Sequence, residues 1–280
     1  MSLHLSSPSG RGTRVASNAL LIVLGVLFLV PMLWVLLASL DAKATFSLQV
    51  PQAPSLDNFG AVLTPELTWV PLLNSTILSG GAGVVATVVA TLAAYPLSRF
   101  RARFNRAFLT AVLFAICLPL TALMVPVYSL FAAVDLADST PVTVLFLGTA
   151  LLPVTIWMMK NFIDQVPIEL EEAAWTDGAS SWRALRAIVV PLVRPGLAVV
   201  FIFVFVNSWG NFFVPFVLLQ TQAKLPGAVT IFSFFGQYGS VQYGQLAAYS
   251  IVYSVPVLAL YVLVSRLVGG SSAFAGAVKG

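Results

Sequence analysis

Residues 169–196 read ELEEAAWTDGASSWRALRAIVVPLVRPG, and they hold four acidic side chains and three arginines. The whole chain of 280 residues is only 9% charged and 59% hydrophobic. Charged groups are costly to bury unless they are paired, so such a cluster needs water or a polar partner. We therefore expect residues 169–196 to lie outside the apolar body of the protein.

The first part of this stretch has the pattern of a short helix that ends in a glycine turn. Pro167 suits a first helical turn, and the acids Glu169, Glu171 and Glu172 that follow it would stabilise a helix N-terminus. The helix should end near Asp177 and Gly178, because glycine readily adopts the left-handed conformation that follows many helices.

The second part has the pattern of a capped amphipathic helix. Ser180 or Ser181 can cap its N-terminus, and Pro191 should end or bend it. Arg183 and Arg186 would flank an apolar stripe. The residues expected in that stripe are Trp182, Leu185, Ile188 and Val189.

The rest of the chain has the composition of a membrane protein. Its mean hydropathy is +0.96, which is too apolar for a soluble domain with a polar surface. Six apolar runs reach or approach the roughly 20 residues that a membrane-spanning helix needs. Internally hydrogen-bonded helices then predict an all-α bundle of six transmembrane helices. The runs are residues 19–40, 72–97, 107–131, 142–159, 197–219 and 246–265.

The first run could also belong to a signal peptide. It is longer than the apolar region of such a peptide and lacks a clear cleavage site, so we interpret it as an uncleaved first span.

The distribution of basic residues predicts the orientation of the bundle. Twelve of the 14 lysine and arginine residues lie in the two tails and in the segments that follow the second and fourth runs. Only Lys43 and Lys224 lie in the other connecting segments. Basic residues favour the cytoplasmic side, so both termini and the charged stretch should be cytoplasmic. The net charge of +4 reflects this bias and not a nucleic-acid surface.

Several function classes lack support in the sequence. The six runs contain no charged residue, although ion-driven carriers usually keep such residues in the membrane. There is no Gly-rich loop for nucleotide phosphate and no catalytic triad, paired carboxylates or metal-ligand cluster. We interpret Asp135 and Asp138 as solvated turn residues, and neither Cys117 nor His4 indicates a site.

Uncharged polar side chains indicate a possible translocation path. Asn74 lies in the second run, and Asn207, Ser208, Trp209 and Asn211 lie in the fifth. Such groups could line a hydrophilic path, or they could simply bond neighbouring helices.

The outer segment 220–245 is rich in aromatic and amide side chains. Gln237, Tyr238 and Tyr243 suit contact with a neutral polyhydroxy ligand or a polar protein surface. The alternative is an aromatic belt at the membrane interface.

Two interpretations of residues 169–196 remain open from the residues alone. The two helices could lie on the bilayer interface, with Trp175 and Trp182 as anchors. They could also form a projecting element that fits a groove on a soluble partner.

A family resemblance favours the second interpretation. The stretch resembles the EAA motif of ABC importer permeases, in which E-A-A, a glycine, an isoleucine and L-P recur at fixed spacing. Only Val190 departs, since leucine is usual there, and Asp177 precedes the glycine. The matching residues are Glu172, Ala173, Ala174, Gly178, Ile188 and Pro191.

The chain from about residue 20 onward resembles the carbohydrate-importer subgroup typified by the second permease subunit of the maltose system. The segments AAYPLSRFRARFNR, NFIDQVPIELEEAA, WGNFFVP and the terminal GAVKG carry this resemblance. Asn211 departs from it, because the subgroup often has Asn directly after Trp209. The residues before GAVKG also differ from the Gly-Leu-rich sequence usual there.

The resemblance implies a heteromeric importer in a bacterial or archaeal plasma membrane. Its partners would be a homologous second permease, a homodimeric cytoplasmic ATPase, an extracytoplasmic binding protein and a sugar. This chain would bind no cofactor, because ATP and Mg would sit on the ATPase. The tail residues Gly276, Lys279 and Gly280 would face the ATPase, and Gln237, Tyr238 and Tyr243 could contact the binding protein or the sugar.

The domain organisation expected from this resemblance is simple. Residues 1–18 and 269–280 would be cytoplasmic tails around a six-span permease domain at 19–268, with the EAA loop at about 167–195. Another neutral or polyol-like solute is the alternative to a sugar. An autonomous channel for uncharged solutes would explain the spans but not the EAA loop.

Overall fold

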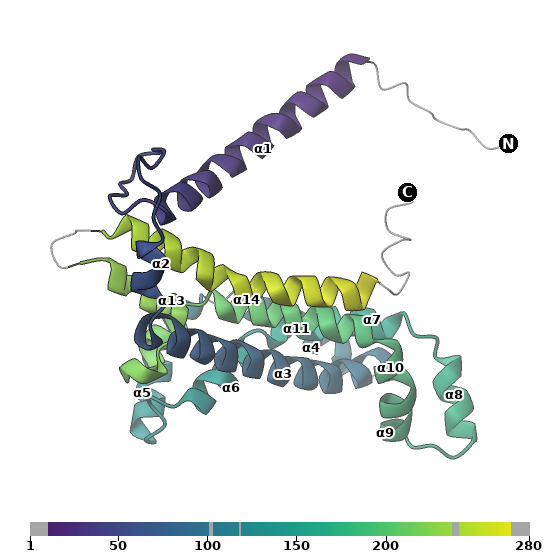
Figure 1. Ribbon diagram of the computed structural model, residues 1–280. Coiled ribbons are helices and arrows are strands. Elements are labelled where there is room, and N and C mark those ends of the chain that lie inside the picture. The colour runs from purple at the N-terminus through teal and green to yellow at the C-terminus, as the bar shows by residue number, and fades with distance from the viewer. Residues whose placement is uncertain (1–10, 101–102, 118, 237–240, 270–280) are drawn as a thin grey trace. The chain divides into compact units, whose positions relative to one another are not determined.

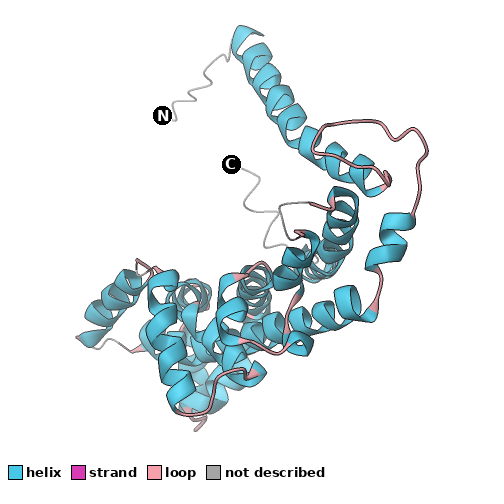
Figure 2. Cartoon of the chain, turned by 90° about the vertical axis from the view of Figure 1, so that its left-hand side faces the viewer, coloured by secondary structure: helices cyan, strands magenta, loops and turns pink. Residues whose placement is uncertain are grey.

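The computed structural model describes residues 11–100, 103–117, 119–236 and 241–269. Its elements are helices joined by loops, and no strand occurs in these ranges (Figures 1 and 2). The chain divides into two compact units. Unit 1 comprises residues 1–64 and 233–252, and unit 2 comprises residues 65–232 and 253–280.

Unit 1 contains α1 (Arg11–Ser39), α2 (Asp57–Val62) and the first part of α14 (Tyr243–Gly269). The apolar side chains of α1 are largely exposed, as Phe28 is at 72%. Such a helix needs lipid or another subunit around it. Asn58 of α2 is buried, and its Nδ2 donates to the carbonyl oxygens of Ser39 and Asp41 at 3.2 and 2.9 Å. That side chain therefore fixes the connection after α1.

Unit 2 contains the remaining helices and the second part of α14. The short elements η1 and η2 are π-helical turns, and η3 and η4 are 3₁₀ turns. In chain order the elements are η1 (Pro65–Trp69), α3 (Val70–Arg99), α4 (Phe104–Ala115), α5 (Leu120–Ala133), α6 (Thr140–Ala150), α7 (Leu152–Asp164), α8 (Glu169–Thr176), α9 (Ser181–Ala184), η2 (Leu185–Val189), α10 (Val190–Leu192), α11 (Arg194–Trp209), α12 (Phe213–Leu218), η3 (Gln222–Lys224), α13 (Gly227–Thr230) and η4 (Ile231–Phe234), the last of which runs into unit 1.

Helix α3 is the centre of unit 2 and packs against α6, α7 and α11. Its small residues permit this close approach. A side chain at Gly83 would come within 2.7 Å of Phe201 on α11. At Gly148 of α6, a Cβ would come within 3.0 Å of the Ala82 carbonyl of α3. The small residues of α3 and α6 thus bring the backbones of neighbouring helices together, as small residues do in many membrane bundles.

Three of the expected spans are interrupted. The run at 107–131 forms α4 and α5, and the run at 142–159 forms α6 and α7, which are bent by 57°. The run at 197–219 forms α11, which ends at Trp209, and the separate α12. Prolines 119 and 153 explain the first two interruptions, because proline lacks the N–H that would continue the helix.

The number of spans depends on how the interrupted helices are counted. Within the described residues, three helices are long and apolar enough to cross a membrane, or up to six if each bent pair is one span. One of those pairs joins residues 181–192 to α11 at an angle of 78°. The sequence had placed residues 181–192 outside the spans.

Candidate coupling hairpin and translocation cavity

The glycine turn forms as the sequence predicts. α8 ends at Thr176, and Gly178 has a φ of +84°, the left-handed conformation that glycine adopts at low cost. The N–H groups of Gly178 and Ala179 donate to the carbonyl oxygens of Trp175 and Ala174, at 3.0 and 2.9 Å. These two hydrogen bonds satisfy the last carbonyls of the helix and set the direction of the chain beyond it.

The second helix begins at its predicted cap and contains an unpredicted π turn. The Ser180 hydroxyl oxygen accepts the Arg183 N–H at 3.3 Å. α9, η2 and α10 then run continuously to Leu192, one residue after Pro191. The N–H of Val190 donates to the carbonyl of Leu185, five residues earlier, which makes this turn wider than an α-helical turn. Pro191, the next residue, has no N–H to donate. We call residues 169–192 the coupling hairpin.

The apolar stripe of the second helix differs from the prediction at Trp182. Leu185 and Val189 are only 4% and 0% exposed, and they pack in a core shared with α3 and α7. Ile188 is half-buried. Trp182 is 61% exposed, and Ala184 is buried instead. Leu185, Ile188 and Val189 all lie within the π turn η2, whereas Trp182 lies in the preceding α9. The wider π turn changes the angle between these residues and Trp182 about the helix axis.

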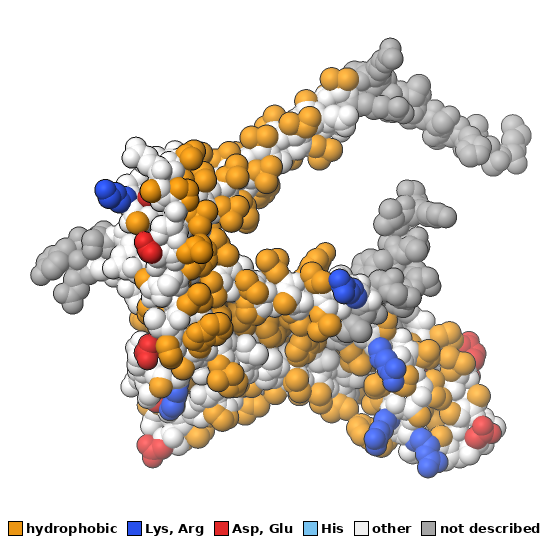
Figure 3. Space-filling model, in the orientation of Figure 1, with side chains coloured by type: hydrophobic (Ala, Val, Ile, Leu, Met, Phe, Trp, Pro, Cys, Tyr) orange, Lys and Arg blue, Asp and Glu red, His pale blue; other side chains and the backbone are white. Residues whose placement is uncertain are grey.

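The residues of the EAA motif are exposed or half-buried on the hairpin. Glu172, Ala173, Asp177 and Gly178 are exposed, whereas Ala174, Ile188 and Pro191 are half-buried. Arg183, Arg186 and Arg194 are also exposed. Figure 3 shows basic side chains gathered at the α8–α10 end of unit 2, while apolar side chains cover its middle. The hairpin therefore exposes charged side chains and its glycine turn at one end of an apolar bundle.

Glu171 is the hairpin residue whose role the sequence did not reveal. Its side chain is 0% exposed, and its Oε1 accepts the Arg99 Nε–H at 2.6 Å. Its Oε2 accepts the Tyr95 hydroxyl at 2.7 Å. Arg99 also donates through Nη2 to the Val166 carbonyl at 2.9 Å. The sequence grouped Glu171 with Glu169 and Glu172 as acids of a first helical turn, and nothing local distinguishes it from them.

A second polar contact secures the same end of α3. The Ser98 hydroxyl donates to Asp164 Oδ1 at 2.5 Å, and Lys160 Nζ donates to Asp164 Oδ2 at 2.6 Å. The C-terminal ends of α3 and α7 are therefore joined beside the hairpin.

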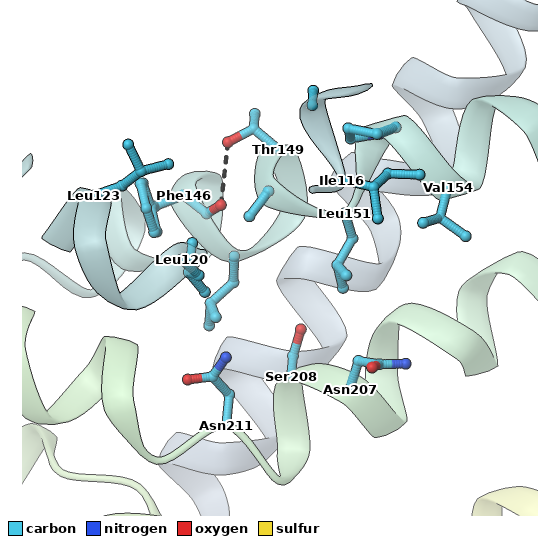
Figure 4. A pocket seen from close by; sticks show the side chains of 14 residues that line it. Ile116, Leu120, Leu123, Phe146, Thr149, Leu151, Val154, Asn207, Ser208 and Asn211 are labelled. Atoms are coloured by element: carbon cyan, nitrogen blue, oxygen red, sulfur yellow. Dashed lines mark hydrogen bonds between the residues drawn. The ribbon is translucent and has the colours of Figure 1, made fainter. Parts of the chain in front are cut away.

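A cavity of about 460 Å³ lies where three interrupted helices meet. Its walls come from the break between α4 and α5, from α6 and α7, and from the end of α11. Figure 4 shows Asn207, Ser208 and Asn211 on one side, facing apolar side chains such as Leu120 and Leu151. The helix breaks near Pro119 and Pro153 thus lie beside the space that these polar residues line.

The polar side chains of the cavity retain capacity for hydrogen bonding. Asn207 Nδ2 donates to the Phe203 carbonyl at 2.7 Å, and Asn211 Oδ1 accepts the Val214 N–H at 3.0 Å. Among the residues that the structure describes, the other end of each carboxamide has no hydrogen-bond partner. Ser208 is 5% exposed, and within the described residues its buried hydroxyl has no hydrogen-bond partner. A ligand with hydroxyl groups could bond to the carboxamides of Asn207 and Asn211, which are less buried than Ser208.

Two of the residues expected in the path do not line this cavity. Trp209 is 4% exposed and stacks between Phe205 and Tyr253, at centroid distances of 5.4 and 5.2 Å. Its neighbour Ser208 lines the cavity in its place. Asn74 does not line this cavity either, and its Nδ2 donates to the carbonyls of Ala223 and Leu225 at 2.8 and 3.1 Å. Asn74 therefore holds the segment after α12.

Asp138 is not the solvated turn residue that we expected. Its carboxylate accepts the Lys224 ammonium at 2.8 Å, the Thr221 hydroxyl at 2.6 Å and the backbone N–H groups of Gln220 and Thr221. Lys224 is the main cause that holds the pKa of Asp138 well below its usual range. Asp138 thus clamps the α5–α6 connection to the segment after α12, while Asp135 remains exposed.

Of the remaining candidate residues, the structure describes only Tyr243. Tyr243, in unit 1, packs against Trp34 and Phe46, each at a centroid distance of 6.2 Å. Gln237, Tyr238 and the tail residues Gly276, Lys279 and Gly280 lie outside the described residues. Among the described residues, no group of His, Cys, Asp and Glu side chains could hold a metal ion.

Comparisons with known proteins agree with this architecture. Residues 83–270 match the family model described as binding-protein-dependent transport system inner membrane component. The trehalose transport system permease protein SugB of Mycobacterium tuberculosis is 32% identical over 90% of this chain and 93% of its own. The diacetylchitobiose uptake system permease protein NgcG of Streptomyces coelicolor is 31% identical over 95% of this chain and 89% of its own.

A solved structure shows the same fold. The chain in the crystal structure of a bacterial ABC transporter that imports the acidic polysaccharide alginate has a TM-score of 0.78 and 21% identity, covering 93% of this chain and 99% of that one. The family match and the two relatives each cover well over half of this chain. The protein therefore belongs to the family of binding-protein-dependent transport system inner membrane components, as a non-catalytic, multi-pass transmembrane permease subunit.

Proposed function

We propose that this chain is one permease subunit of an ATP-driven importer of sugars. The coupling hairpin carries the proposal, because it is an ordered, exposed element at the basic end of an apolar bundle. The two relatives above that take trehalose and diacetylchitobiose make a disaccharide-sized, neutral solute the first candidate. Another polyol-like solute is the alternative.

In this proposal the coupling hairpin docks into a groove on a homodimeric cytoplasmic ATPase, which binds the ATP and Mg. The exposed residues Glu172, Asp177 and Gly178 would enter the groove, since short amphipathic elements suit such docking. The exposed Ala173 would also contact the ATPase. The half-buried residues Ala174, Ile188 and Pro191 would support the contacting surface from below. The tail residues Gly276, Lys279 and Gly280 would approach the same ATPase, and both termini would be cytoplasmic.

The cavity at Asn207, Ser208 and Asn211 would form this chain's half of the translocation path. Uncharged donors and acceptors suit a neutral polyhydroxy solute, because they replace its bonds to water without requiring a counter-charge. A homologous second permease would supply the other half. The bent pairs α4–α5 and α6–α7 would each count as one span in the proposed six-span arrangement.

The outer face would receive an extracytoplasmic binding protein. The segment that contains Gln237, Tyr238 and Tyr243 is our candidate for this contact, since aromatic and amide groups suit both sugars and polar protein surfaces.

Purification and reconstitution test the proposal. The tagged chain is expected to copurify with a soluble ATPase, and ATP hydrolysis in proteoliposomes should rise when the binding protein encoded beside it is added with trehalose or diacetylchitobiose. Solute uptake without any ATPase would favour an autonomous channel. Stimulation by a charged amino acid, and by neither sugar, would overturn the assignment of the solute class.

A further inference from the structure

α8 is attached to unit 2 mainly through one buried side chain. Figure 1 shows α8 standing apart from α3, and Glu171 is its only buried residue. The second helix of the hairpin is attached differently, because Leu185 and Val189 enter an apolar core. Apolar surfaces can slide past one another, whereas hydrogen bonds to a charged group constrain its position and direction.

The contacts of Glu171 hold its carboxylate from two sides. Tyr95 and Arg99 lie four residues apart, on one face of α3, and each bonds to a different carboxylate oxygen. The exposed fractions are 0% for the Glu171 side chain and 5% for that of Arg99. Separating a buried ion pair leaves uncompensated charges, which is strongly unfavourable. The pair should therefore stay closed when the hairpin moves.

α3 extends from these contacts to the other end of unit 2. Its 30 residues correspond to a helix about 45 Å long. Near its N-terminus, Asn74 holds the carbonyls of Ala223 and Leu225, and the Ser75 hydroxyl oxygen accepts the Gly227 N–H at 2.9 Å. Between the two ends, Gly83 and Gly148 permit close packing with α11 and α6, which line the cavity. One helix thus contacts the hairpin, the cavity-lining helices and the segment after α12.

We propose that Glu171, Tyr95 and Arg99 form a rigid joint, the Glu171 joint, through which movement of the coupling hairpin is transmitted to α3. The inference rests on the proposed function, because it needs an ATPase that moves the hairpin. The three residues are positioning residues, since their side chains are buried and bond to one another. Their role is to keep α8 and α3 moving as one body.

Three variants, made in the full complex, test the joint. Glu171→Gln removes the charge at constant size, Glu171→Asp keeps the charge but shortens its reach, and Tyr95→Phe removes one hydroxyl. Glu169→Gln is the matched acid control, because Glu169 is exposed and lies two residues away on the same helix. Tyr261→Phe is the matched hydroxyl control, because Tyr261 is 66% exposed.

The decisive quantity is the amount of radiolabelled trehalose or diacetylchitobiose transported per ATP hydrolysed in proteoliposomes. A hydrogen bond to a charged group contributes about 1.5–3 kcal/mol, which corresponds to a change of roughly tenfold or more in an equilibrium constant. We expect Glu171→Gln to lower this ratio about tenfold, and Glu171→Asp and Tyr95→Phe to lower it about threefold. The ATPase should remain bound, and both controls should keep the wild-type ratio.

A purely structural role predicts a different result. The variants would then be less abundant or would melt earlier, but each folded complex would transport the wild-type amount per ATP. That outcome for Tyr95→Phe, the mildest variant, would overturn the joint while leaving the proposed function intact. Absence of an ATPase from the wild-type preparation would instead overturn the proposed function, and the joint with it.

Discussion

At the scale of single residues, Gly178 is the position where backbone conformation matters most. Its φ is +84°, and an added Cβ would meet no atom within 4 Å. The cost of a side chain there is therefore conformational, on the order of 1–2 kcal/mol and more for a β-branched residue. We expect Gly178→Val to keep near-normal membrane abundance but to weaken ATPase association and abolish substrate-stimulated ATP hydrolysis.

The control for this change lies at the same position. Gly178→Asn should behave like the wild type, because asparagine tolerates the left-handed conformation better than other residues with a side chain. Copurification of the ATPase and its stimulated activity are the measurements. Equal loss in both variants would mean that the hairpin needs a bare glycine surface and not a particular turn.

Asp138 gives a residue-scale prediction about pH. Its pKa lies below the ordinary value, so the clamp stabilises the fold above about pH 4, the usual aspartate pKa, and is lost as the pH falls through the lower folded-state pKa. Asp138→Asn should therefore cost about 1 kcal/mol between pH 5 and 8 and should remove this acid dependence.

Asp135→Asn is the matched control for Asp138. Both aspartates have a positive φ, of 54° and 56°, but the side chain of Asp135 is exposed. The control should change stability by less than about 0.5 kcal/mol. Melting temperatures of the complex in nanodiscs across this pH range distinguish the two. An equal shift in both variants would argue against the clamp.

At the scale of elements, the hairpin was largely predictable from sequence and its attachment was not. The acids at Glu169–Glu172, the glycine at 178 and the cap at Ser180 are local signals, and each lies where it was expected. The burial of Glu171 depends on Arg99, 72 residues earlier in the chain. No local pattern carries that information. Periodicity had placed Trp182 on the apolar stripe, but Trp182 is exposed, and the π turn after it was likewise not predicted.

The buried side of the hairpin gives a prediction at this scale. Leu185→Ala should destabilise the chain by about 2–5 kcal/mol, because it leaves a cavity against α3 and α7. Trp182→Ala should change the stability of the chain much less, since Trp182 is 61% exposed. Proteolysis of the hairpin in membranes measures both. Greater protease sensitivity for Trp182→Ala would show that the periodic pattern was right and the observed burial wrong.

At the scale of the whole molecule, the sequence predicted the membrane class and the family but not the cavity. Composition alone indicates apolar helices. The breaks beside the cavity arise at Pro119 and Pro153, and the end of α11 adds Asn207 and Ser208 to the lining. Prolines are common in membrane helices, so which of them opens a space depends on how the helices pack.

The central claim is that the coupling hairpin docks on an ATPase at the cytoplasmic side. The most direct test places a photo-crosslinking amino acid at Ala179, beside the glycine turn, or at Gln222, an exposed residue after α12. In intact cells, we predict that position 179 crosslinks to a nucleotide-binding protein, and that position 222 does not. A crosslink to the ATPase from position 222, or only lipid adducts from position 179, would contradict the account.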